Sequence, residues 1–322
     1  MNRGFIGALS LSVTFALLAG CGVSQSPITT PDAVLQSRTD AFQPRTGSWA
    51  LPEASGDDLV YVTSLGKSLL MYSYPQGQLV GSITGLTGIY GECADNSGDV
   101  FVISQTTLYE YAHGGTKPIA SISIPASAVN CAVDPSSGDV AVVTDNALYV
   151  YPAQQGPPSQ YLDGSFENMA SATYDSNGDL FLVGINASRS FLLAELPDGG
   201  GSLTTISTPI SNPFGTAAVQ WDGQYLAVAT RPRNKGNGRL YQLEASGSAA
   251  HIIHSSKLKH GKIGTFTTIA FSLQRDVMVL PIAPHTLGFW KYPQSGSPQQ
   301  TIKVGNRNQY LNAPVFSAAP SK

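Results

Sequence analysis

The chain has 322 residues, of which 42% are hydrophobic and 12% are charged, and its formal net charge at pH 7 is −3. This apolar content is enough for a sizeable core, and the charge balance argues against a general nucleic-acid binder or an acidic disordered chain. The 33 glycines and 21 prolines indicate a chain with many turns. No helical period of useful length follows the first twenty residues.

A targeting signal is predicted over residues 1–20. Arg3 supplies the positive end, and Ala8–Leu18 is an apolar stretch of the length expected for the core of a signal peptide. It is shorter than the roughly 20 residues that a membrane-spanning helix needs. The run Leu18–Cys21 (LAGC) resembles the bacterial lipoprotein signal, in which the cysteine is lipidated and becomes the new N-terminus. The alternative is an ordinary signal peptide with a cysteine nearby by chance.

The lipoprotein resemblance implies export and an anchor at Cys21. Gly22 rather than Asp follows this cysteine, which in such lipoproteins usually goes with the outer membrane. Residues 21–56 are rich in Ser, Thr, Pro and Gln, so we expect a flexible tether. The chain is therefore predicted to be lipid-anchored to a bacterial outer membrane, on the periplasmic side or at the cell surface. The folded domain is expected over residues 57–322.

The stretch Gly91–Ile124 contains the unit that the folded domain repeats. Turn clusters rich in Gly, Asn and Asp separate four short runs of β-type residues. These runs are Glu92–Ala94, Val100–Ser104, Thr107–Tyr111 and Ile119–Ile124. A lone four-stranded meander cannot bury both of its faces, so this unit requires copies of itself on either side.

Six copies of the unit are present, with strands a to d numbered from the inside outward. The most apolar strands align at Val60, Val100, Val140, Leu180, Tyr225 and Val277, with spacings of 40, 40, 40, 45 and 52 residues. Such a period is typical of a β-propeller. The first copy lacks strand a, and Asn312–Ala319 has the pattern of a surplus one. We therefore predict an all-β, monomeric, six-bladed propeller of four-stranded blades, closed by the C-terminal strand in blade 1, which removes an open edge.

Three motifs support a family resemblance. They are the D-x-x-G-D hairpins at Asp95–Asp99 and Asp175–Asp179, the Y-x-Y-P strands, and the run Tyr111–Pro118 (YAHGGTKP). With these motifs the chain resembles NHL-type and TolB-like six-bladed propellers, and most closely a set of uncharacterised bacterial lipoproteins, over Asp57–Pro320. The resemblance implies the fold but no reaction, because such propellers host ligand binding, scaffolding and hydrolysis alike.

Aspartate and histidine are the residue types that could indicate a metal. The hairpin aspartates are Asp95, Asp99, Asp134, Asp139, Asp175 and Asp179. They lack the ligand spacing of an EF-hand loop, and Asp commonly caps such turns, so we expect structural turns. His113 is expected in an outer turn, and His251 and His254 on opposite faces of one strand. No metal site is therefore predicted.

The sequence contains no recognisable nucleophile motif and no nucleotide-binding fingerprint, so no catalytic residue and no cofactor is predicted. The alternative function is a metal-dependent, lactonase-type hydrolase. Gluconolactonase-like six-bladed enzymes hold a divalent metal in the central channel, and Glu92, Asn130 and Asn312 resemble part of that ligand set. One carboxylate and two amides would hold a hard cation weakly. We expect these three residues to be solvated at the channel mouth.

Cys93 and Cys131 lie near the starts of neighbouring inner strands. Their side chains have opposite parity when counted from the adjacent turns, which can aim the two sulfurs at each other across a blade interface. Export would bring the two thiols into an oxidising compartment, where a disulfide can form. A disulfide and two buried free thiols both remain open at this point.

The later repeats are lengthened mainly on one edge, in the b→c and d→a connections Gly184–Ser190, Thr230–Gly238 and Ser255–Gly264. Insertions on one edge of a repeat protein usually mark its binding face. The segment 231–262 carries a net charge of +6. Its basic residues, the predicted basic rim of blade 5, are Arg231, Arg233, Lys235, Arg239, Lys257, Lys259 and Lys262.

These patterns predict a binding or scaffold module in the cell envelope. The expected partner of the basic rim is an anionic glycan, a lipid head group or an envelope protein, while nucleic acid is not expected. Chance clustering of solvated basic residues is the alternative for the rim. A purely structural envelope protein without a small ligand is a third function that the sequence allows.

Overall fold

The computed structural model describes residues 50–322 apart from 65–66, 155, 211–216, 231–237, 260–269, 284, 306–310 and 321–322. All of them belong to the second of two compact units, Pro44–Lys322. The predicted signal peptide and Cys21 lie outside the described residues. None of the described helices is long and apolar enough to cross a membrane.

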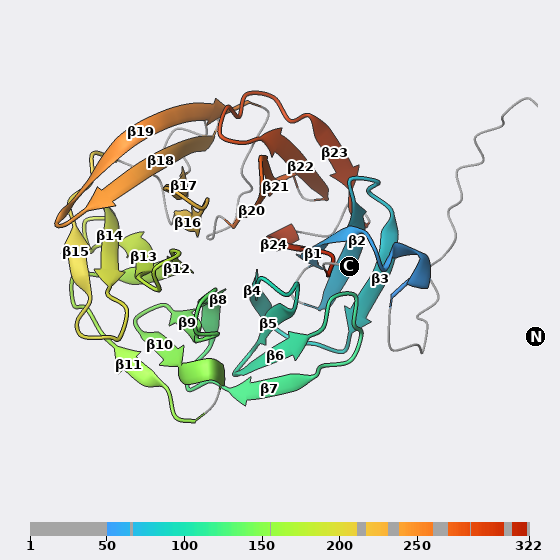
Figure 1. Ribbon diagram of the computed structural model, residues 1–322, viewed down its shortest axis with the longest axis horizontal. Coiled ribbons are helices and arrows are strands. Elements are labelled where there is room, and N and C mark those ends of the chain that lie inside the picture. The colour runs from blue at the N-terminus through green and yellow to red at the C-terminus, as the bar shows by residue number, and fades with distance from the viewer. Residues whose placement is uncertain are drawn as a thin grey trace, which may run out of the picture. The chain divides into compact units, whose positions relative to one another are not determined.

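Six four-stranded antiparallel sheets form the blades of a ring (Figure 1). The strands of blades 1 to 3 are β1 (Asp58–Ser64), β2 (Ser68–Tyr74), β3 (Leu79–Thr84), β4 (Ile89–Ala94), β5 (Val100–Ser104), β6 (Thr107–Tyr111), β7 (Ala120–Ser123), β8 (Ala128–Val133), β9 (Val140–Thr144), β10 (Leu148–Tyr151) and β11 (Ser159–Tyr161). Short 3-10 turns, η1 (Pro52–Ala54) and η2 (Pro152–Gln154), precede β1 and follow β10.

Blades 4 to 6 follow in chain order. Their strands are β12 (Asn168–Tyr174), β13 (Leu180–Ile185), β14 (Phe191–Leu196), β15 (Thr204–Ile206), β16 (Ala218–Trp221), β17 (Leu226–Thr230), β18 (Gly238–Ser246), β19 (Ala249–Leu258), β20 (Ser272–Gln274), β21 (Val277–Ala283), β22 (Thr286–Lys291) and β23 (Gln300–Lys303). The last strand, β24 (Leu311–Ser317), becomes the inner strand of blade 1 in the order β24-β1-β2-β3. The predicted architecture, including its closure, is confirmed.

Each blade buries both of its faces because it packs between two neighbours. All five residues of β5 are buried; Val100 and Val102 pack toward blade 1, whereas Phe101 and Ile103 pack toward blade 3. Successive side chains of a strand point to opposite faces, so one apolar run serves two interfaces. The core is accordingly a set of six clusters between blades.

The same alternation corrects the sequence alignment in the last two blades. Leu226 and Met278 pack toward the preceding blade, as Val100 does in blade 2. The aligned residues Tyr225 and Val277 therefore lie one position too early. Because both faces of these strands are buried, apolar residues occur at consecutive positions, and apolar character alone could not show which of them aligns with Val100.

Closure of the ring adds side-chain contacts to the β24–β1 ladder. His113 is buried, and its Nδ1 lies 2.7 Å from the Oγ of Ser317 at the end of β24. His113 lies in the turn between β6 and β7, the two outer strands of blade 2, as predicted, and it is buried there by the last strand of the ring. Gly98 fits at this junction because a Cβ there would lie 2.2 Å from the carbonyl oxygen of Ala318. The backbone N–H of Gly114 also donates to the Tyr61 hydroxyl in blade 1.

Two sequence-based details of the outer strands are corrected. Ser255–Leu258 belongs to β19, and Gly184 and Ile185 belong to β13, so these parts of the expected connections are strand. A β-bulge opposite Gln242 and Leu243 pairs His254 with Gln242 and His251 with Glu244. Because the bulge inserts one residue, the two histidines lie on the same face of the sheet, contrary to the prediction.

Candidate functional site

The connections between strands divide the propeller into two faces. The hairpin face carries the a→b hairpins and the c→d turns, and the connection face carries the b→c and d→a connections. The antiparallel order of strands within every blade fixes this division. Each charged residue of a connection can therefore be assigned to one face.

The aspartates of the a→b hairpins serve as turn caps. The Asp95 Oδ1 accepts hydrogen bonds from the backbone N–H groups of Ser97, at 2.9 Å, and of Asp99, at 2.8 Å. Asp134 and Asp175 cap the corresponding hairpins of blades 3 and 4 in the same way. The second aspartate of each hairpin accepts from the c→d turn of its own blade, as when Asp139 accepts from the Ala153 N–H at 2.7 Å. The recurring aspartates thus have a structural role.

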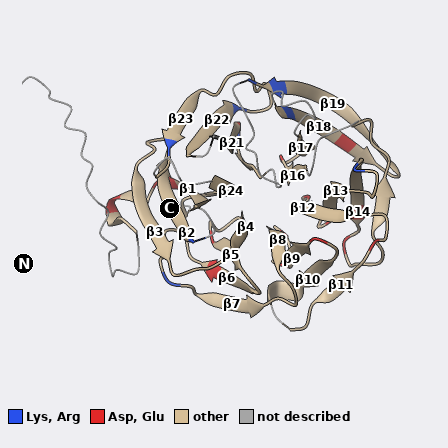
Figure 2. Cartoon of the chain, turned by 180° about the vertical axis from the view of Figure 1, so that it is seen from behind, with Lys and Arg blue, Asp and Glu red and all other residues tan. Residues whose placement is uncertain are grey.

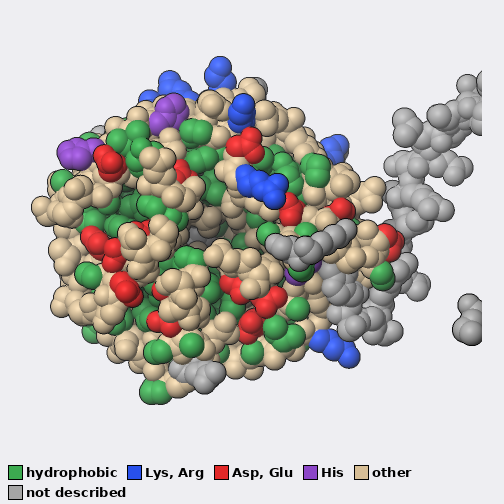
Figure 3. Space-filling view, viewed as in Figure 1, with side chains coloured by type: hydrophobic (Ala, Val, Ile, Leu, Met, Phe, Trp, Pro, Cys, Tyr) green, Lys and Arg blue, Asp and Glu red, His purple; other side chains and the backbone are tan. Residues whose placement is uncertain are grey.

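These aspartates also make the hairpin face acidic, and Figure 3 shows Asp and Glu side chains around a central hollow. The aspartates on this face are Asp58, Asp95, Asp99, Asp134, Asp139, Asp175, Asp179, Asp198, Asp222 and Asp276. The basic residues among its described turns are Lys117, Arg275 and Lys291.

The connection face has the opposite balance. Its described basic residues are Lys67, Arg189, Arg239, Lys257, Lys259 and Lys303. Its described acidic residues are Asp145, Asp163 and Glu167. The net charge of the chain therefore conceals a strong separation of charge across the ring.

The predicted basic rim begins the d→a connection of blade 5 at the outer edge of the ring, where the backbone N–H of Lys259 donates to the Gly296 carbonyl in the c→d turn of blade 6 at 2.6 Å. Arg239 of β18 is the cross-strand partner of Lys257 of β19, and Lys259 comes two residues after Lys257. Figure 2 shows basic segments in blue on β18 and β19. Lys257 and Lys259 are exposed and Arg239 is half-buried. Within the described part of the chain none of these three side chains makes an ion pair. Arg231, Arg233, Lys235 and Lys262 lie outside the described residues.

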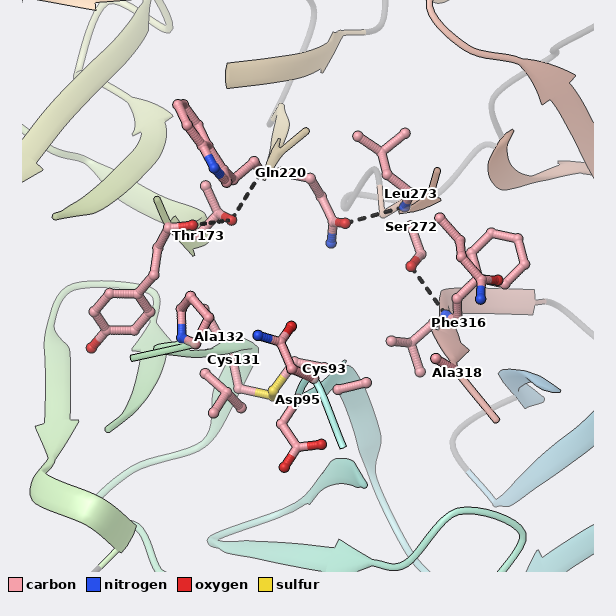
Figure 4. Close-up of a pocket in the computed structure, with 18 of the residues that line it drawn as sticks. Cys93, Asp95, Cys131, Ala132, Thr173, Gln220, Ser272, Leu273, Phe316 and Ala318 are labelled. Atoms are coloured by element: carbon pink, nitrogen blue, oxygen red, sulfur yellow. Dashed lines mark hydrogen bonds between the residues drawn. A yellow bond between two sulfur atoms is a disulfide. The ribbon is translucent and has the colours of Figure 1, made fainter. Parts of the chain in front are cut away.

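A central pocket of about 310 Å³ opens on the hairpin face, where the inner strands of the six blades end (Figure 4). Every blade contributes to its lining. The aromatic side chains in it are Tyr174, Trp221 and Phe316, and the polar ones include Asp95 and Gln220. The Trp221 indole nitrogen is buried and has no hydrogen-bond partner among the described residues.

Polar side chains around this pocket join each blade to the next. The Thr173 Oγ1 accepts from the Trp221 N–H at 3.0 Å, and the Ser272 Oγ accepts from the Phe316 N–H at 3.0 Å. The Gln220 Oε1 accepts from the backbone N–H of Leu273 in blade 6 at 3.2 Å. These bonds satisfy inner-strand N–H groups that have no further strand to pair with, and so hold the pocket wall rigid.

At the corresponding position of blade 2 a covalent link replaces the hydrogen bond. Cys93 and Cys131 form a disulfide with an S–S distance of 2.04 Å, across the interface of blades 2 and 3. Its sulfur atoms lie beside the pocket (Figure 4). The structure thus places these two cysteines in a bond that the sequence left open.

The three expected channel-mouth residues do not line this pocket. The Asn130 Oδ1 accepts from the Ala172 N–H at 2.9 Å, and the Asn312 Nδ2 donates to the Tyr90 carbonyl at 3.1 Å. Glu92 is buried instead of being solvated, and neither of its carboxyl oxygens has a hydrogen-bond partner in the described part of the chain. Its side chain points toward blade 1, because its cross-strand partner Val102 packs there.

This arrangement does not support the ligand set of the lactonase-type alternative. Both amides are engaged with backbone groups of neighbouring blades, and burial raises the pKa of Glu92 well above its ordinary value. Among the described residues, no group of three or more His, Cys, Asp or Glu side chains is arranged to hold a metal ion.

No known protein family and no curated protein matches the sequence. The fold has many relatives among solved structures. A protein of unknown function from Bacteroides caccae is 13% identical, with a TM-score of 0.58, over 81% of this chain and 99% of that one. TolB from Acinetobacter baumannii is 12% identical, with a TM-score of 0.57, over 83% of this chain and 68% of TolB.

The chain has a TolB-like β-propeller fold. A streptogramin B lyase is also similar, at 13% identity and a TM-score of 0.50, over 78% of this chain and 75% of that one. At such identities the likeness concerns the fold alone, and function has to be argued from the site.

Proposed function

We propose that this protein is an exported, lipid-anchored β-propeller that serves as a binding or scaffold module in the bacterial cell envelope. Its connection face would take an anionic partner through the basic rim of blade 5. The observation that carries the proposal is the separation of charge between the two faces. A chain of net charge −3 would not attract an anion uniformly, but Arg239, Lys257 and Lys259 are adjacent cations that form no ion pair with any described residue.

The described rim residues suit carboxylate or phosphate. The guanidinium of Arg239 can form two parallel hydrogen bonds to such a group, and Lys257 and Lys259 add point charges. Since none of the three forms an ion pair within the described residues, binding would not require breaking one. Acidic glycans and anionic lipid head groups share this chemistry. A lipid-anchored domain would meet both at a membrane surface.

The anchor and the rim can be tested separately. Cys21→Ser should move the folded protein from the membrane fraction to the soluble fraction, since the tether separates the anchor from the core. If the Cys21→Ser protein still sediments with membranes and resists a salt wash, the anchor is not at this cysteine. The rim is tested with defined anionic ligands, namely phosphatidylglycerol vesicles and an acidic polysaccharide, which distinguish the two sources of anionic groups.

A further inference from the structure

A second pocket on the hairpin face lies between blades 3 and 4 and has a volume of about 200 Å³. Asp134 and Asp139 line it from the a→b hairpin of blade 3, and Asp198 lines it from the c→d turn of blade 4. Tyr161 and Tyr174 supply two aromatic rings. Among the described residues the lining contains no Lys, Arg or His, so three carboxylates line this space without a described cation.

Gly178 allows two of these carboxylates to approach each other. A Cβ at this position would lie 3.1 Å from the Asp198 Oδ1 and 3.3 Å from the Asp134 Oδ2. Both oxygens therefore lie close to the same point beside Gly178, where a side chain would crowd the two carboxylates. Burial raises the pKa of Asp134, but hydrogen bonds from Ser136 and Ser137 outweigh burial and lower it overall, so this carboxylate stays ionised.

Tyr174 provides an independent indication of a ligand. Its side chain is only 7% exposed, and its hydroxyl has no hydrogen-bond partner among the residues that the structure describes. Burial raises the pKa of this hydroxyl, and the charges that raise it further are those of Asp139, Asp134, Tyr161 and Asp198. These four residues and Tyr174 line the same pocket, so the hydroxyl lies close to the carboxylates of that pocket. Buried polar groups are normally satisfied, and a phenol can accept a hydrogen bond from an ammonium group.

The size and lining of the pocket favour an organic cation over a metal ion. No metal-holding group of three ligating side chains occurs in the described part of the chain. A volume of about 200 Å³ exceeds what a single ion needs and lies below that of drug-sized pockets. Aromatic faces attract ammonium groups, and carboxylates form charge-assisted hydrogen bonds with them.

We propose that the pocket between blades 3 and 4 binds a small aliphatic amine that carries one or two ammonium groups. Asp134, Asp139 and Asp198 would neutralise the charge, and the Tyr174 hydroxyl would accept an N–H of the ligand. This site is separate from the basic rim, which lies at the outer edge of blade 5 beside blade 6. The two can therefore be lost independently.

Calorimetric titration of the purified protein with 1,4-diaminobutane tests the proposal, with 1,4-butanediol as the uncharged ligand of the same length. We expect saturable binding of the diamine to one site and none of the diol. Asp198→Asn should weaken the binding at least about tenfold, and Tyr174→Phe severalfold. The matched control is Asp276→Asn, which removes an equal charge from the same face in blade 6 and should leave binding unchanged.

Three outcomes would overturn the proposal. One is equal binding of diamine and diol, which would mean that charge does not matter. Another is equal weakening by Asp198→Asn and Asp276→Asn, which would mean that only the overall acidity of the face attracts the amine. The third is displacement of the diamine by Ca²⁺ in a manner that depends on Asp198, which would assign the pocket to a metal ion.

Discussion

The Nδ1 of His113 lies 2.7 Å from the Oγ of Ser317, a residue 204 positions later in the chain. The same Ser317 hydroxyl donates to the carbonyl of Gly98 in blade 2. Burial lowers the pKa of His113, which favours the neutral imidazole at this contact. The end of the chain is thus held by blade 2 through side chains, in addition to its ladder with β1.

Ser317→Ala tests this contact. The substitution leaves the His113 Nδ1 and the Gly98 carbonyl buried without this partner, so we expect the free energy of unfolding to fall by about 1–3 kcal/mol. Urea unfolding of the purified protein measures it. Ser97→Ala, in the exposed part of the same hairpin, should change stability little. Equal stability of both variants and the wild type would show that the contact contributes nothing.

Removal of residues 312–322 tests the closure as a whole. Blade 1 would lose its inner strand, and β1 would expose an unpaired edge. Each ladder hydrogen bond contributes on the order of 1 kcal/mol net, and lost apolar packing adds to this, so we expect the entire ring to unfold at a lower temperature. An unchanged melting temperature would contradict the closure.

Reduction of the Cys93–Cys131 disulfide should destabilise the propeller. The bond closes a segment with a sequence separation of 38 residues. In the chain-entropy description, such a link contributes roughly 4 kcal/mol. The double variant Cys93→Ser/Cys131→Ser should have a lower melting temperature than the wild type. A reductant should lower the melting temperature of the wild type but not that of the double variant. Recovery of two alkylated thiols from protein exported under oxidising conditions would contradict the bond.

Glu92 gives the stability of the fold a defined pH dependence. Its folded pKa is raised by burial above the ordinary 4.5, so the folded state holds its proton more tightly than the unfolded state does. Stability is therefore highest below the ordinary value and is lost as the pH rises toward the raised folded pKa. Glu92→Gln removes the charge, so it should exceed the wild type in stability at about pH 8, and the difference should shrink near pH 5.

Unfolding in urea at several pH values measures this difference. The matched control is Glu53→Gln, an exposed carboxyl outside the blades. A Glu92→Gln variant less stable than the wild type at high pH would show that the buried carboxylate has a compensating partner.

The repeats made the architecture predictable from the sequence. A period near 40 residues with a missing first strand and a surplus last one left few alternatives to a closed ring. Contacts between blades were not predictable, because Asn130 and Thr173 bond to backbone groups 42 and 48 residues away through geometry that no local pattern records. The burial of His113 was missed for the same reason, since its partner lies at the other end of the chain.

Three further features differ in whether the sequence could have revealed them. The bulge that brings His251 and His254 to one face inserts a single residue and has no marker of its own. The separation of charge, in contrast, could have been found by assigning each connection to its edge. The pocket between blades 3 and 4 could not have been found from the sequence, because Asp134 and Asp198, which line it, belong to different blades.

The most direct test of the proposed function compares two triple variants of the same net charge. One replaces the rim residues Arg239, Lys257 and Lys259 with Gln, and the other replaces Lys117, Arg275 and Lys291 of the hairpin face with Gln. Binding to phosphatidylglycerol vesicles and to an acidic polysaccharide is measured at low and physiological salt, in the Cys21→Ser background so that the lipid anchor cannot contribute. We expect the rim variant to lose at least about tenfold in affinity, while the hairpin-face variant binds at the wild-type level with the same weakening by salt. Equal affinity of the two variants for both ligands would contradict an anion-binding connection face.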